Sequence, residues 1–210
     1  MYVPKADRTL GEEEWRAFVD SQRFGHMIAA GAGEAWDYPV VAPTQFVLDH
    51  DEAVMHFAAP NPILKALAEN PNAVLSVAGD WAFIPSAWKA IDGEDPALGI
   101  PTTYYAAVQL RGRARLASSN AETAAVLRRQ LAVLQPEVPV ADPEEAHPQK
   151  LNGIRAVTLH VEDVITKFKY GGNVDEAHRR AVIEHLNKRD GPGDDAAARH
   201  TQRRLGSEPL

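Results

Sequence analysis

Strand-like segments joined by short turns constrain the fold of this chain more than any other feature. Residues 24–30 and 40–48 are rich in apolar and β-branched side chains, and the turn-forming Gly31-Ala32-Gly33 lies between them. A polar turn at residues 49–52 leads directly into the next such segment. Strands that follow one another through turns this short pair antiparallel, because parallel pairing needs a crossover of about a dozen residues or more. The pattern therefore predicts a mainly β fold, an antiparallel β-barrel with helices on its flanks, and not a doubly wound parallel sheet.

The complete pattern predicts about six strands and a few scattered helices. The expected strands cover residues 24–30, 40–48, 53–58, 73–78 followed by 81–84, 104–116 and 154–165. The expected helices cover residues 10–22, 62–68, 121–134 and 175–188. We expect these elements to form one domain over residues 1–189, followed by a polar C-terminal tail at residues 190–210 that begins with Gly191-Pro192-Gly193.

Composition and charge narrow the functional classes. The 210 residues include no cysteine, which excludes disulfides, thiolate metal sites and cysteine nucleophiles. The formal net charge is −7, and we interpret the basic clusters at residues 179–180 and 199–204 as solvated helix faces. Direct nucleic-acid binding is therefore not expected. The sequence shows neither a secretory signal nor the apolar run of about 20 residues that spans a bilayer, so we expect a cytoplasmic protein and no membrane partner.

Motifs for several common chemistries are missing from the sequence. It contains no P-loop, dinucleotide fingerprint or G-x-S-x-G elbow. The histidines at positions 147, 160, 178 and 185 are interpreted as surface or structural residues, and 178 and 185 are too far apart for the i, i+4 spacing of a zinc site. We therefore predict no metal site, and nothing in the sequence supports nucleophilic hydrolysis.

A strand-to-helix junction at residues 56–62 is the first candidate site. His56 ends a strand, and Asn61-Pro62 begins a helix with the residue types favoured at the N-cap and the first helical position. A helix N-terminus gathers N–H groups and partial positive charge, which suit a phosphate. A plain turn with a capping asparagine explains the same residues, so both interpretations stay open.

Lys167-Phe168-Lys169 is the second candidate. Residues alternate between faces along a strand, so both lysines lie on one side and Phe168 on the other. Two ammonium groups on one face repel each other unless an anion or an acid lies between them. A phosphate ester satisfies this requirement, and so does water at an exposed strand edge. Asn173 follows at the Gly171-Gly172 turn, which would bring backbone and a side-chain amide close to a ligand.

Several stretches together resemble one protein family. They are residues 1–4 (MYVP), 56–62 (HFAAPNP), 82–88 (AFIPSAW), 101–105 (PTTYY) and 167–173 (KFKYGGN). In order, spacing and residue type they are similar to the FMN-binding negative transcriptional regulators of the PaiB-like family, among the split-barrel flavoproteins related to pyridoxine-phosphate oxidase. The resemblance covers most of the chain.

The resemblance implies a fold, a cofactor and a set of site residues. The fold would be a six-stranded antiparallel split β-barrel that forms a homodimer, with FMN at the subunit interface. His56 and Asn61 would lie near the phosphate, and Ser86, Trp88, Thr102 and Thr103 would line the isoalloxazine ring. Lys167, Lys169 and Asn173 would arrive from the partner subunit.

The chain also departs from the family pattern. Ala59 stands where the family has an arginine, the planar fork best suited to a phosphate. The Ser-Pro order is inverted at Pro85-Ser86, Thr103-Tyr104 replaces a Trp-Asn pair, and Gly171-Gly172 replaces Ser-Gln. A charge-assisted contact contributes about 1.5–3 kcal/mol, so the missing arginine predicts weakened flavin binding.

Three functional hypotheses follow. The first is a homodimeric FMN-binding regulator that represses transcription directly or through a protein partner. The second is a flavin-dependent oxidoreductase acting on a small oxidised substrate, because in a flavoprotein the cofactor carries the chemistry and few catalytic side chains are needed. The third is a split barrel that has lost its cofactor. The sequence identifies no catalytic residue.

Overall fold

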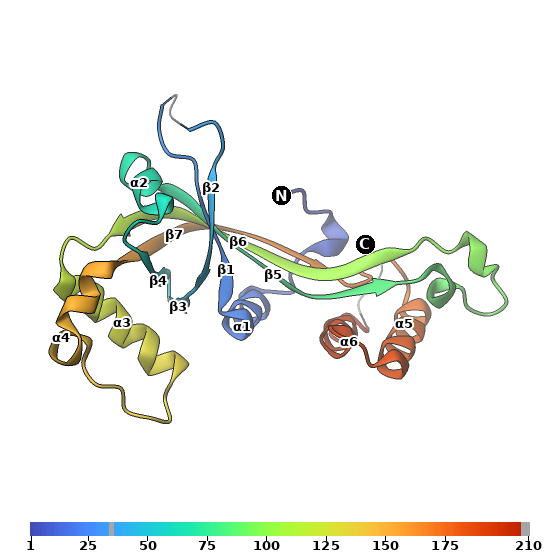
Figure 1. Ribbon diagram of the computed structural model, residues 1–210. Coiled ribbons are helices and arrows are strands. Elements are labelled where there is room, and N and C mark those ends of the chain that lie inside the picture. The colour runs from blue at the N-terminus through green and yellow to red at the C-terminus, as the bar shows by residue number, and fades with distance from the viewer. Residues whose placement is uncertain (34–35, 207–210) are drawn as a thin grey trace. The chain divides into compact units, whose positions relative to one another are not determined.

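The computed structural model describes residues 1–33 and 36–206, and these divide into two compact units (Figure 1). Unit 1 comprises Met1–Trp15, Ala78–Val108 and Thr166–Leu210. Unit 2 comprises Arg16–Val77 and Gln109–Ile165. Each unit is therefore assembled from stretches that are far apart in the sequence.

The strands form an antiparallel sheet with the order β2-β1-β5-β6-β7-β4-β3. They are β1 (Phe24–Ala29), β2 (Val40–Gln45), β3 (Val47–Asp49), β4 (Glu52–Ala58), β5 (Asn72–Ile84), β6 (Thr102–Leu116) and β7 (Ile154–Lys169). Within the described residues, β2 and β3 lie at the two edges, so the strand pairing is not closed into a barrel. The mainly β, antiparallel fold with flanking helices agrees with a split-barrel type, but the sheet has seven strands and not the expected six.

One local feature adds the seventh strand, and a second joins two expected stretches without changing the count. The segment predicted as one strand at residues 40–48 is divided at Phe46, whose N–H donates to the carbonyl of Arg23 at 3.1 Å and whose side chain is fully buried. Conversely, the two segments predicted around Asp80 form the single strand β5, although Asp80 has a positive φ of 50°. Neither feature has a clear signal in the residue pattern.

The predicted helices are confirmed with small shifts at their ends. They are α1 (Glu12–Gln22), α2 (Pro62–Glu69), α3 (Asn120–Leu134) and α5 (Glu176–Arg189). Asn61 caps α2 and Asp175 caps α5, each accepting from a backbone N–H of the first turn. The structure adds α4 (Pro143–Ala146), α6 (Asp194–Gln202) and four short 3-10 helices, η1 (Lys5–Asp7), η2 (Ser86–Lys89), η3 (Pro96–Leu98) and η4 (Pro148–Gly153).

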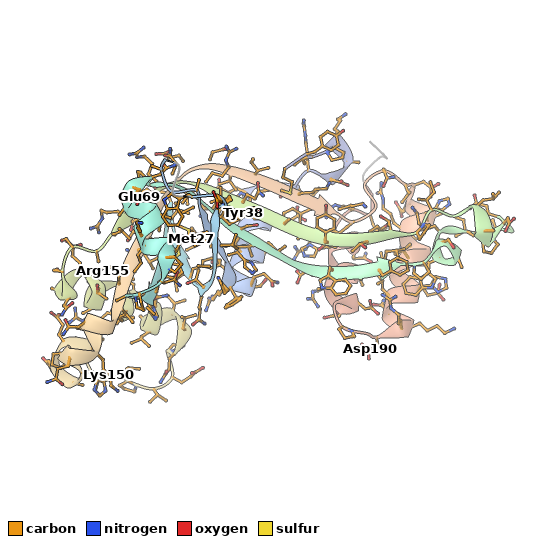
Figure 2. All side chains as sticks on the ribbon, turned by 45° about the horizontal axis from the view of Figure 1, so that its top comes forward. Met27, Tyr38, Glu69, Lys150, Arg155 and Asp190 are labelled. Atoms are coloured by element: carbon orange, nitrogen blue, oxygen red, sulfur yellow. The ribbon has the colours of Figure 1, made fainter. Side chains whose placement is uncertain are left out.

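Unit 2 has an apolar interior. One cluster packs side chains from β3, β4 and β7 with α3 and the segment before it, namely Val47, Val54, Ala117, Val126 and Ala156. Met27 on β1 is fully buried as well (Figure 2). Burial of this apolar surface is therefore the main stabilising contribution in unit 2. In the same unit, Gly112 on β6 lies so close to the carbonyl of His160 that any Cβ there would overlap it.

Unit 1 contains α5 and α6, which pack against each other (Figure 1). Residues 194–202, which we placed in a polar C-terminal tail, form α6 with Ala197, Ala198, His200 and Thr201 buried. No apolar periodicity predicts this helix, because its buried face consists of small and polar side chains instead of large apolar ones. The division at residue 190 stays a prediction.

None of the helices in the described part of the chain has the length and apolar character needed to cross a membrane.

Candidate functional site

In unit 1, two lysines lie beside the start of β6. Lys169 at the end of β7 donates from Nζ to the Thr102 hydroxyl oxygen at 2.6 Å, and Lys89 at the end of η2 donates to the carbonyl of Ile100 at 3.2 Å. Both lysines are partly buried. Partial burial, followed by the nearby charge of Lys169, holds the pKa of Lys89 below its usual range. Thr102 and Lys169 lie in the stretches that predicted a site, whereas Lys89 belongs to no recognised motif and was not predicted.

Lys167 has different surroundings, although it lies on the same strand as Lys169. Its Nζ is 3.5 Å from the buried carboxylate of Asp7 and donates to the carbonyl of Tyr2 at 3.3 Å. It also lies 5.7 Å from the centre of the Tyr105 ring, within reach of a cation–π interaction. The acid that we left open as a partner for the two lysines is therefore present, but it serves Lys167.

Trp88 in η2 packs against α5. Its ring stacks on His185 with a centroid distance of 5.1 Å and an interplanar angle of 11°, and the Arg189 guanidinium lies 4.4 Å from the ring centre. His185 and Arg189 are four residues apart and so share one face of α5. This contact positions the loop that carries Lys89. His185 and Arg189 also cover part of the Trp88 ring that we expected to face the flavin. The role of Trp88 beside a flavin stays a prediction.

The remaining expected site residues of unit 1 lie on neighbouring loops and strands. Ser86 and Thr103 are partly buried, and Asn173 is exposed. Gly99 lies against the Ser86 carbonyl so closely that a Cβ at Gly99 would overlap it. These three residues have positions but no contact that assigns them a role.

The Gly171-Gly172 turn before Asn173 makes close contacts inside unit 1. Gly171 has φ of +75°, and a Cβ placed there would lie 2.6 Å from the hydroxyl of Tyr104. A Cβ at Gly172 would overlap the carbonyl of Ala6. Burial raises the pKa of Tyr104 to about 12, so its phenol stays neutral at physiological pH. The glycines are explained by packing against the protein itself, independently of a ligand.

His56 and Asn61 belong to unit 2, whereas the other seven expected site residues belong to unit 1. His56 Nδ1 lies 2.8 Å from the side-chain oxygen of the buried Gln130 on α3. Asn61 accepts from the N–H of Ile63 at 3.0 Å, as a capping residue does. Both therefore have structural partners, and their expected contact with a phosphate stays a prediction. Ala59 is exposed beside them.

A buried charged network in unit 1 was not anticipated from the sequence. Arg204 Nη1 lies 3.1 Å from a Glu14 carboxylate oxygen, and His200 Nε2 lies 2.9 Å from a carboxylate oxygen of Asp80. The Tyr170 ring stacks on His200 at 4.5 Å. Arg179 and Arg204 are almost completely buried, so the interpretation of both basic clusters as solvated helix faces is wrong for these two residues.

This network shifts the titration of its members. Burial alone would raise the pKa of Glu14, but the hydrogen bonds from His200, Leu10 and Arg204 lower it to about 2. Burial opposes protonation of His200, yet Asp80 and Glu14 together hold its pKa above the usual value. The network thus contains an ionised carboxylate and a stabilised imidazolium inside unit 1.

No group of three or more metal-ligating side chains occurs among residues 1–33 and 36–206.

The chain matches one known protein family over most of its length. Residues 1–163 match the family described as "Putative FMN-binding domain". No curated protein matches this chain.

Several solved structures are similar in fold. The flavocytochrome Anf3 from Azotobacter vinelandii is 21% identical, with a TM-score of 0.58 over 78% of this chain and 69% of that one. The FAD and heme binding protein from Mycobacterium smegmatis is 19% identical, with a TM-score of 0.57 over 78% and 73%. A protein from Bacteroides thetaiotaomicron, provisionally described as a 5-nitroimidazole antibiotic resistance protein, is 10% identical. Its TM-score is 0.56 over 76% of this chain and 84% of that one. At these identities the likeness concerns the fold alone.

Proposed function

Because this chain belongs to the FMN-binding domain family that matches its residues 1–163, we propose that it binds FMN as a homodimer and acts as a PaiB-type negative regulator of transcription. The structural observation that carries the proposal is the cationic strand end of β7, where Lys169 lies 2.6 Å from Thr102. A phosphate monoester has a charge of about −1.5 to −2 at pH 7 and is bound best by such charge-assisted donors. When bound, the flavin supplies electron transfer.

The donors around the phosphate follow from the hydrogen bonds already formed. We assign Lys167 and Lys169 to the phosphate, Lys169 by its charge and Lys167 by the N–H donor that remains beside its contacts with Asp7 and Tyr2. Asn61 uses its side-chain oxygen for the cap of α2, so its amide N–H group is the donor that it contributes. Similarly, His56 uses Nδ1 toward Gln130 and contributes Nε2. We assign Ser86, Thr102, Thr103 and the edge of Trp88 to the ring system, with Asn173 beside it.

Dimerisation is supported by apolar side chains that unit 1 exposes. Trp81 is 62% exposed and Phe83 is 49% exposed, and both lie on the same face of β5 because they are two residues apart. Large exposed aromatic side chains are typical of interaction surfaces. We expect an interface above about 2,000 Å² in total. Light scattering at micromolar concentration should give twice the 22.9 kDa of one chain, and a monomer would contradict the shared flavin site.

Regulation is proposed to operate through a protein partner. Arg199 pairs with Asp195, Arg180 pairs with Glu176, and Arg204 is buried, which leaves little free positive charge for DNA phosphates. Electrophoretic shifts at about 150 mM salt should therefore show no tight binding to DNA. A nanomolar, sequence-selective shift would instead establish a direct repressor.

The decisive experiment for the cofactor is spectroscopic. The purified protein is recorded across the flavin absorption bands and then titrated with FMN and with riboflavin. We expect FMN to bind more tightly than riboflavin, because only FMN has a phosphate. If neither FMN nor riboflavin binds at hundreds of micromolar, the proposal is contradicted. If a small oxidised substrate reoxidises the bound, reduced flavin and is itself reduced, the oxidoreductase hypothesis is favoured over the regulator.

A further inference from the structure

Lys89 is a lysine whose position is fixed but whose charge has no acidic partner within the described residues. It ends η2, and the contact of Trp88 with Arg189 at 4.4 Å holds this short helix against α5. The Nζ atom donates to the carbonyl of Ile100 at 3.2 Å, which leaves two of the three ammonium protons for other acceptors. The ammonium group is thus held in place before any ligand arrives.

Lys169 supplies a second ammonium at the same strand start, because its Nζ binds Thr102, two residues after the Ile100 carbonyl that accepts from Lys89. Besides burial, the positive charge of Lys169 also contributes to lowering the pKa of Lys89. The donation from Lys169 to the Thr102 oxygen at 2.6 Å leaves the hydroxyl proton of Thr102 free to point toward an anion. In the described part of the chain, neither lysine is paired with a carboxylate. By contrast, Lys167 has Asp7 at 3.5 Å. The unbalanced positive charge of this region is therefore at Lys89 and Lys169 and not at the Lys167–Lys169 pair that the strand pattern suggested.

We propose that Lys89, Lys169 and Thr102 form a binding site for a phosphate-type dianion that is complete within one protomer. Two ammonium groups and one hydroxyl donor match the charge of a phosphate monoester or of inorganic phosphate. A metal cation is repelled by the same groups. The site does not depend on the flavin proposal, because inorganic phosphate alone is sufficient to occupy it.

Two sources of this chemistry are distinguishable. In one, the dianion is the phosphate of FMN, so that Thr102 contacts the phosphate and not the ring system, and Lys89 adds a cation to the flavin site. In the other, it is a separate phosphate ligand that binds beside the flavin. Both use the same three side chains, and they differ in whether substitution of Lys89 changes flavin affinity.

The first measurement follows the amine itself. Reductive methylation with a 13C label makes each lysine visible by NMR, and the resonance that is missing in Lys89→Met identifies Lys89. The pKa of Lys89 should lie below the usual range of a lysine, and inorganic phosphate should raise it, because a bound anion stabilises the charged amine. A purely structural Lys89 would not respond to phosphate.

The second measurement compares affinities for inorganic phosphate, FMN and riboflavin in wild type, Lys89→Met, Lys89→Arg and Lys150→Met. Lys150 is exposed in unit 2 and provides a charge-matched control (Figure 2). Lys89→Met should weaken phosphate binding at least tenfold, whereas Lys89→Arg, which keeps the charge, and Lys150→Met should bind almost as wild type does.

The outcomes separate the proposals. A parallel loss of FMN affinity in Lys89→Met, with riboflavin unchanged, identifies the flavin phosphate as the ligand. Loss of phosphate affinity with unchanged FMN affinity identifies a separate anion. If phosphate at tens of millimolar neither shifts the Lys89 resonance nor binds more weakly to Lys89→Met than to Lys150→Met, the site does not exist, even where FMN binds through other residues.

Discussion

Unit 1 and unit 2 both bury apolar side chains, but the charged side chains that are buried among the described residues all lie in unit 1. The interior of unit 2 contains an apolar cluster in which Val54 and Ala156 have almost no exposed surface. Unit 1 instead buries an ion pair between Glu14 and Arg204 and a contact between His200 and Asp80. Apolar packing is insensitive to protonation, whereas a buried charge depends on the protonation of its partners. Acid should therefore weaken unit 1 before it weakens unit 2.

The largest effect should follow from breaking the charged network. Glu14→Ala leaves Arg204 buried without its carboxylate, and the loss of one partner of a buried pair costs about 3–5 kcal/mol of unfolding free energy. The folded pKa of Glu14 is about 2 and its ordinary value is 4.5, so the carboxylate stabilises the fold above about 4.5 and ceases to do so as the pH falls through about 2.

Urea unfolding of Glu14→Ala and wild type at pH 7 and pH 3 measures this. The difference between the two proteins should be smaller at pH 3. An equal difference at both values would mean that Glu14 acts through packing alone, and Glu14→Gln, which keeps the volume, provides the comparison.

A core substitution in unit 2 should cost almost as much but without pH dependence. Met55 on β4 is fully buried, and truncation of such a side chain to alanine costs about 2–5 kcal/mol. Met55→Ala should show the same loss in urea unfolding at pH 4 and pH 7. A loss that varies with pH would remove the contrast between the two units.

FMN affinity provides a test of the assigned site residues of unit 1. The double variant Lys167→Met, Lys169→Met keeps most of the apolar stems and removes two charges. FMN affinity should fall at least tenfold, about 1.4 kcal/mol, in a fluorescence titration. Riboflavin, which has no phosphate, should be affected less. An equal loss for both flavins would show that these lysines contact the ring or support the fold.

The corresponding test in unit 2 is Ala59→Arg. Ala59 is exposed, so the longer side chain should be tolerated without loss of stability. A single charge-assisted contact predicts tighter FMN binding by about tenfold or more. If wild type ignores FMN and Ala59→Arg binds it, the chain has lost its cofactor and kept the fold. If Ala59→Arg binds FMN no more tightly than wild type, position 59 does not belong to the flavin site.

The smallest effect concerns His200. Its folded pKa is raised above the ordinary 6.5, so the protonated imidazole stabilises the fold below about 6.5, and this contribution is lost as the pH rises through the folded pKa. The melting temperature of wild type should therefore fall between pH 6 and pH 8 more than that of His200→Gln. The exposed His50→Gln should behave as wild type does, and identical slopes for all three would contradict the assignment.

The elements that were predictable from the sequence are those encoded by local pattern. The helix capped by Asn61 and the helix capped by Asp175 both begin where the capping residues indicated. The break at Phe46 and the continuity of β5 through Asp80 depend on partners that are distant in sequence or on tertiary packing. Helix α6 was missed for a related reason, because its buried face includes His200 and Thr201, which read as polar surface.

The candidate site was predictable by residue type and only partly by geometry. The alternation at Lys167-Phe168-Lys169 correctly indicated a strand with Phe168 buried. It could not show that Asp7 pairs with Lys167, since the two are 160 positions apart in the sequence. Lys89 ends η2, one residue past the 82–88 stretch, and only the folded structure brings it to the same strand start as Lys169.

The pairing of Glu14 with Arg204 has a consequence for synthesis of the protein. The two residues are 190 positions apart, so this contact cannot form until Arg204 has left the ribosome. Unit 2 ends at Ile165 and so has all of its strands available earlier. During translation, the carboxylates of Glu14 and Asp80 are therefore hydrated until Arg204 and His200 have been synthesised. Unit 2 is already able to fold at that stage. The segment around Arg204, which emerges after all of unit 2, is thus the one that completes the charged network of unit 1.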